Sequence, residues 1–70
     1  MIQMRLTSSL FWVDVRLLEI NGRWLASADT PDGPSLGLGT SALGAIEMAV
    51  QPFDGMVEEL LASVPLPGLD

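Results

Sequence analysis

The chain has 70 residues, 49% of them hydrophobic, and carries nine acidic against three basic residues, for a net charge of −6. Cysteine and histidine are absent, which excludes disulfides and the common zinc sites. The only basic side chains are three scattered arginines, which are too few for a phosphate-binding face, so direct nucleic-acid binding is not expected. No apolar run approaches the roughly 18 residues of a membrane helix and no secretory signal is recognisable, so we expect one cytoplasmic domain over residues 1–70 without membrane contact.

The small size makes a partner subunit the expected source of extra stability. A domain of this length buries only about 60% of the surface of its unfolded chain and is marginally stable alone. Because neither disulfides nor zinc can help, association with a second copy is the remaining means, and we expect a homodimer.

The first residues alternate between apolar and polar side chains. The apolar positions are Ile2, Met4 and Leu6. This period of two predicts a strand extension over residues 1–6. The alternative is a tail that precedes a translation start at Met4.

A β-hairpin is the strongest local prediction. Residues 10–20 are rich in Val, Leu, Phe and Trp, and Asn21-Gly22 suits the positive φ angles of a two-residue type I′ turn. Such a short loop fixes the register of the two strands. The register places Ile20 opposite Arg23, Glu19 opposite Trp24, Leu17 opposite Ala26, and Val15 opposite Ala28.

This register gives the hairpin two different faces. The first suits a covering helix, because its alanines allow close approach; it comprises Val13, Val15, Leu17, Trp24, Ala26 and Ala28. The second comprises Leu10, Trp12, Asp14, Arg16, Leu18, Ile20, Leu25 and Ser27. The second face holds more apolar area than a solvated face normally shows. We therefore expect another subunit to cover it, or alternatively residues 2–7 or the C-terminal tail.

A turn and a short strand follow the hairpin. Residues 30–33 read Thr-Pro-Asp-Gly, and this Pro and Gly suit a tight turn. Residues 35–39 then form a short strand with Leu36 and Leu38 on one side. The glycines between these leucines indicate close packing or a bulge.

A helix over residues 41–64, kinked or broken at Pro52, completes the prediction. Thr40 or Ser41 caps it, and Asp54 is expected to cap its second segment. Residues 65–70 are expected to form a loose tail. The predicted fold is α+β, with an antiparallel sheet of three or four strands packed on one face by this helix. The predicted core comprises Val13, Val15, Leu17, Trp24, Leu43, Ile46, Val50, Phe53, Val57 and Leu60.

The side chains offer little catalytic chemistry. His, Cys, Lys and Tyr are all absent, so a nucleophile would lack its usual activating partner, and we expect neither enzyme activity nor a cofactor. Asp14, Asp29 and Asp32 would lie near one end of the sheet, where they hold Mg²⁺ or Ca²⁺ or serve only as turn residues and solvated charge. Residues 37–42 match a loose dinucleotide fingerprint, but they lack the parallel βαβ unit that this motif requires.

Residues 11–50 resemble the HicB-like antitoxin domains. The matching residues are Gly22, Trp24 and Ala26 in the hairpin, Pro31-Asp32 in the turn, Gly39-Thr40-Ser41 at the Gly-x-Thr helix start, and Ala45 and Ile46 in the helix. Gly44 departs from the usual Glu, the Pro-Gly-Cys end of the turn is missing, and no DNA-binding extension follows. The resemblance implies three strands followed by a helix, and a partner that is a small basic toxin acting on RNA.

The sequence leaves two classes of function open. The first is a protein-binding module, resembling the toxin-binding half of a HicB-like antitoxin, whose acidic charge suits a small basic protein. Its partner or dimer face is predicted to comprise Leu10, Trp12, Leu18, Ile20 and Leu25. The second is an accessory protein that binds a small molecule or a divalent metal at the Asp29–Asp32 loop and the helix start at residues 37–41.

Overall fold

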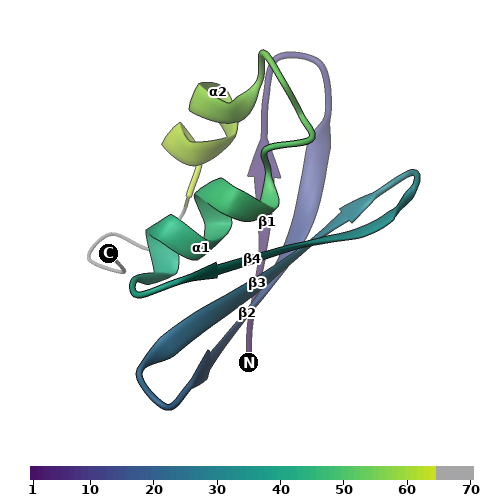
Figure 1. The fold of residues 1–70 in the computed structure, drawn as a ribbon. Helices are drawn as coiled ribbons and strands as arrows, with labels where there is room; N and C mark the ends of the chain where they lie inside the picture. The colour runs from purple at the N-terminus through teal and green to yellow at the C-terminus, as the bar shows by residue number, and fades with distance from the viewer. Residues whose placement is uncertain (65–70) are drawn as a thin grey trace.

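The computed structural model describes residues 1–64 and confirms the α+β prediction. A four-stranded antiparallel sheet with the strand order β1-β2-β3-β4 precedes two short helices (Figure 1). The elements are β1 (Ile2–Thr7), β2 (Trp12–Ile20), β3 (Arg23–Thr30), β4 (Gly33–Gly39), α1 (Ala42–Ala49) and α2 (Val57–Ala62). Residues 2–7 are therefore a strand of the sheet, with Met4 and Leu6 buried.

The hairpin of β2 and β3 has the predicted register. Asn21 and Gly22 have φ angles of 51° and 79°, as a type I′ turn requires. Ile20 pairs with Arg23, and Val15 pairs with Ala28. The side chains that this register assigns to the first face therefore point to the helices, and the others point to the opposite side.

Both helices lie on one side of the sheet, α1 over β4 and β3 and α2 beside β1 (Figure 1). The core lies between these layers. Its buried residues are Met4, Leu6, Val13, Val15, Leu17, Ala26, Ala28, Ala42, Ala45, Ile46, Ala49, Val50 and Leu60. Alanines are frequent in this core, which indicates that the helix and the sheet come unusually close together.

Two glycines of β4 explain this close approach. A Cβ atom on Gly37 would overlap the carbonyl oxygen of Ala45, and one on Gly39 would stand 2.8 Å from the amide nitrogen of Ala45. Both neighbours are backbone atoms, so a side chain at either glycine would push α1 off the sheet. Of the two readings of these glycines, close packing is therefore correct.

The helical region is broken near Pro52, and the two helices begin differently. The Ser41 hydroxyl accepts a hydrogen bond of 3.0 Å from the amide of Gly44, so Ser41 caps α1 as predicted. The prediction that Asp54 caps the second segment is wrong. The N-cap of α2 is Met56, without a side-chain hydrogen bond, because the loop between the helices carries the chain two residues past Asp54.

Four residues of the predicted core are not fully buried. Leu43 is 38% exposed, because α1 turns its alanines rather than this leucine toward the glycines of β4. Trp24 is half-buried at the rim of the core, where it packs against buried residues. Phe53 and Val57 lie at the same rim.

The second sheet face, here called the open face, is uncovered by the described residues. Residues 2–7 lie beside β2 in the plane of the sheet, so they do not fold over this face. The expected tail at residues 65–70 lies outside the described part of the chain. Neither helix in residues 1–64 has the length and apolar character needed to cross a membrane.

Candidate protein-binding face

Four leucines form a continuous patch on the open face, here called the leucine patch. Leu18, Leu25 and Leu38 stand side by side on β2, β3 and β4, because Leu25 pairs with Leu18 on one side and with Leu38 on the other. Leu36 lies two residues from Leu38 on the same side of β4. Leu36 and Leu38 are 63% and 61% exposed, so the patch is most open toward the β4 edge.

The structure brings together three of the five residues predicted for the partner face. Leu18 and Leu25 belong to the leucine patch, and Ile20 follows Leu18 on the same side of β2. Trp12 lies six residues from Leu18 along β2, about 20 Å away in an extended strand. Leu10 is exposed in the loop before β2. The predicted face is therefore two separate regions rather than one.

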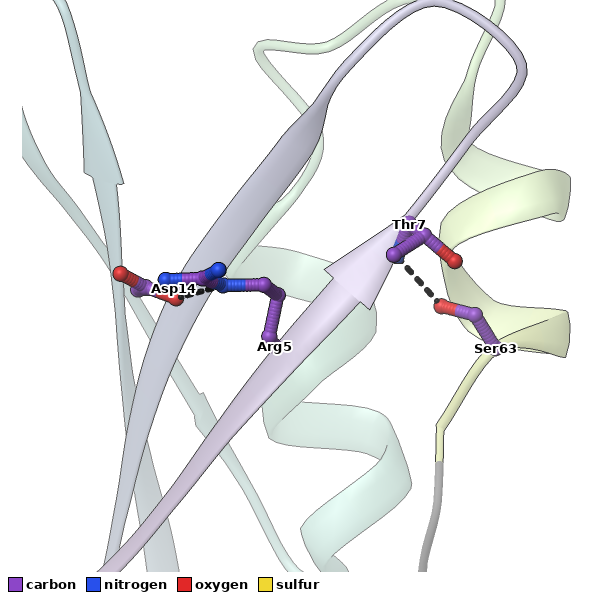
Figure 2. Close-up of polar contacts among 4 residues, drawn as sticks. All are labelled: Arg5, Thr7, Asp14 and Ser63. Atoms are coloured by element: carbon purple, nitrogen blue, oxygen red, sulfur yellow. Dashed lines mark hydrogen bonds and ion pairs between the residues drawn. The ribbon is translucent and has the colours of Figure 1, made fainter.

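The end of the open face around Trp12 is polar. The Arg5 Nε donates to the Asp14 Oδ1 at 2.9 Å, from the neighbouring strand (Figure 2). The Arg5 guanidinium also lies 3.8 Å from the centre of the Trp12 ring. This cation–π contact engages one face of the Trp12 ring, so the ring contributes less free apolar surface than the sequence suggests.

Charge is divided unevenly between the two sides of the molecule. All three arginines alternate along their strands with residues that face the helices, so the arginines lie on the open face. On that face Asp14 pairs with Arg5, and the Asp29 carboxylate lies 3.7 Å from the Arg16 guanidinium. The helical side has no basic residue in the described chain. Its acidic residues, in the helices, the loop between them and the helix-facing side of β2, are Glu19, Glu47, Asp54, Glu58 and Glu59. A basic partner would therefore meet its complement on the helical side.

The acids considered for a metal site do not converge. Asp14 and Asp29 face arginines, and within residues 1–64 no three acidic side chains are placed to hold a metal ion. The glycine-rich run before α1 follows an antiparallel strand, and the Ser41 hydroxyl already binds the Gly44 amide. The dinucleotide fingerprint thus lacks its structural context in the described chain.

A small apolar hollow lies at the Trp12 end of the sheet, where the β1–β2 loop meets the β3–β4 turn. The rings of Phe11 and Phe53 stand 5.3 Å apart at its wall. Its lining comprises Phe11, Trp12, Val13, Asp29, Pro31 and Phe53. The hollow is open to solvent and offers one carboxylate among apolar groups.

Comparison of the chain with protein-family models, curated proteins and solved structures finds no match. The order of three strands followed by a helix, which the HicB-like resemblance implies for residues 11–50, agrees with the structure. That order arises from common turns and caps, so the functional side of the resemblance stays a hypothesis.

Leu36 and Leu38 are the residues of this face that the sequence analysis missed. Their side of β4 was predicted, but the position of β4 beside β3 was needed to place them next to Leu25. The tight turn at residues 31–32 is the feature of the sequence from which this placement could have been predicted. A two-residue loop there sets the β3–β4 register in the same way that Asn21-Gly22 sets the first hairpin.

Proposed function

We propose that this protein is a non-catalytic protein-binding module that binds another polypeptide on the leucine patch. The patch itself is the observation that supports the proposal. It joins apolar side chains from three adjacent strands, and no described residue covers them. Monomeric soluble proteins seldom expose contiguous apolar patches larger than a few hundred Å², and the largest patch on such a protein often has a binding role.

The surroundings of the patch favour a defined kind of partner surface. Arg23 pairs with Ile20 at the hairpin end, and Arg16 pairs with Ser27 on the opposite flank of Leu18 and Leu25. A partner that covers the patch would place apolar side chains at its centre and acceptors or acidic groups at its rim. This arrangement matches the apolar centre and polar rim of ordinary protein interfaces.

A small basic partner, which the net charge and the HicB-like resemblance favour, would bind elsewhere. Glu47, Glu58 and Glu59 lie on the helices, on the side without arginines. Long-range attraction between opposite charges is screened by salt, so such a complex should weaken as ionic strength rises. A complex on the leucine patch should be much less sensitive.

A matched pair of variants tests the proposal. Affinity capture from the native host would compare the wild type with a Leu18→Ser/Leu25→Ser variant and a Leu43→Ser control, which changes a partly exposed leucine on α1. Circular dichroism first establishes that all three are folded. We expect a specific partner to be lost only from the patch variant. Equal capture by all three proteins would exclude the leucine patch as the binding face.

Small-molecule binding in the aromatic hollow is the second candidate function. Phe11 and Phe53 give the hollow an apolar wall, and Asp29 provides a single polar anchor. An apolar amine would suit this chemistry. Trp12 lines the hollow, so a shift of the tryptophan fluorescence on titration with hydrophobic amines, absent in Phe53→Ala, would support this candidate, and an unchanged spectrum would reject it.

A further inference from the structure

The outer edge of β4 carries unpaired backbone groups. Within residues 1–64, β4 is the last strand and pairs only with β3. Thr30 and Gly33 flank a two-residue loop and so form a hydrogen-bonded pair. Along an antiparallel ladder every second pair is hydrogen-bonded, and in the pairs between them the backbone groups point away from the partner strand. The amides and carbonyls of Leu36 and Leu38 therefore point outward. Pro34, which has no amide to donate, stands at the equivalent outward position, as an edge strand requires.

The opposite edge of the sheet is protected. On β1, the outward amide of Thr7 donates to the Ser63 hydroxyl at 2.8 Å, so the end of α2 closes this part of the edge (Figure 2). Arg5 places a charge on the same strand. Charges and covering elements are the usual protection of edge strands against pairing. β4 has no charged residue, and its exposed side chains are those of Pro34, Leu36 and Leu38.

We propose that the β4 edge pairs with the β4 edge of a second copy of this chain, antiparallel, with the two-fold axis at Gly37. In this register Leu36 lies opposite Leu38 of the second copy, and each outward amide of these residues meets an outward carbonyl. A register centred on Leu36 would set Leu38 against Pro34, which has no amide for the Leu38 carbonyl. Of these two registers, the Gly37 register is the one that pairs the amides and carbonyls of both leucines.

The helical layer fits the same arrangement. α1 lies over β4 and β3, so the two α1 helices would lie on the same side of the extended sheet and face each other across the two-fold axis. Gly44 and Met48 line the open groove between α1 and the β4 edge. Gly44 would permit close approach, and the flexible Met48, 56% exposed, would fill the space between the helices.

Electrostatics gives this dimer a distinctive salt dependence. Two copies of net charge −6 repel each other, and Glu47 in the groove would approach Glu47 of the second copy. Salt screens that repulsion, so the dimer should tighten as ionic strength rises. Glu47→Gln should tighten it at low salt. A complex with a basic partner would respond to salt in the opposite direction.

The mass in solution tests the proposal, independently of the proposed partner binding. Sedimentation of the purified protein at about 1 to 100 µM should show a concentration-dependent dimer. Leu36→Pro removes the outward amide and should weaken the dimer about thirtyfold more than Leu36→Ala, which removes the side chain alone. Leu18→Ser alters the open face away from the edge and should leave the dimer intact. A monomeric wild type, or a dimer lost in Leu18→Ser and kept in folded Leu36→Pro, would overturn edge pairing.

Cross-linking tests the register in this cysteine-free chain. Paired Cα atoms across the proposed edge would lie about 5.5 Å apart, within disulfide range, whereas Leu36 and Leu36 of the second copy would lie about 8 Å apart and beyond it. Mixing Leu36→Cys with Leu38→Cys should give disulfide-linked heterodimers on oxidation, and either variant alone should give few. Efficient linking of Leu36→Cys to itself would overturn the Gly37 register.

Discussion

The contact between Gly37 and α1 makes the packing of the fold testable with one methyl group. In Gly37→Ala the new Cβ would overlap the Ala45 carbonyl oxygen and lie 2.5 Å from the Ala49 amide nitrogen and 2.9 Å from the Met48 Cβ. Non-bonded carbon atoms prefer separations of about 3.5 to 4.0 Å, so α1 would have to recede by about 1 Å. The obstructing atoms include backbone, which cannot turn away.

The cost should be large compared with the stability of so small a domain. Overpacking of this kind costs about 1 to 3 kcal/mol, and the rigid neighbours of Gly37 place it at the upper end. Against a total stability of about 5 kcal/mol, most of the margin would be lost. The melting temperature should fall by about 15 °C.

Thermal and urea unfolding, followed by circular dichroism, measure this effect. Gly44→Ala is the matched control, because its Cβ would contact only the Ser41 hydroxyl, at 3.1 Å, and alanine favours a helix. Its stability should stay within about 1 kcal/mol of the wild type. A Gly37→Ala protein that melts within about 2 °C of the wild type would show that α1 does not lie against β4 as described.

Three further substitutions test the ends and the core of the fold by urea unfolding. Leu6→Ala, at a fully buried side chain of β1, should cost about 2 to 5 kcal/mol, whereas an unchanged midpoint would mean that residues 2–7 are a tail. Ser41→Ala removes the cap of α1 and should cost about 1 kcal/mol, and no loss would contradict the capping bond. Asp54→Ala should change stability by less than about 0.5 kcal/mol, and a loss as large as that of Ser41→Ala would restore Asp54 as a helix cap.

The local parts of the fold could be predicted from the sequence because their signals are local. Asn21-Gly22 fixes the β2–β3 register through backbone angles, and Ser41 fixes the start of α1 through one hydrogen bond. Pro52 marks the break between the helices for a similarly local reason. The structure follows all three signals.

The burial of a helix residue could not be predicted from the sequence where it depends on the distance between the helix and the sheet. Leu43 follows the apolar spacing of the helix, yet it is exposed because the glycines of β4 bring the alanine side of α1 against the sheet. The spacing of leucines and valines along a helix does not show whether the helix packs on the sheet through its large side chains or through its alanines. The division of the predicted partner face has a similar cause. Trp12 lies among polar side chains because β1 places Arg5 over its ring, and β1 is a separate segment of the sequence.

Amide hydrogen exchange at Leu36 and Leu38 tests the central claim, that the β4 edge is an intermolecular pairing site, most directly. Both amides should exchange freely at about 1 µM protein and become protected at about 1 mM, while the Leu25 amide, within the sheet, stays protected at both concentrations. Rapid exchange at both concentrations would contradict edge pairing. Equal protection at both would show that another segment of the same chain satisfies this edge.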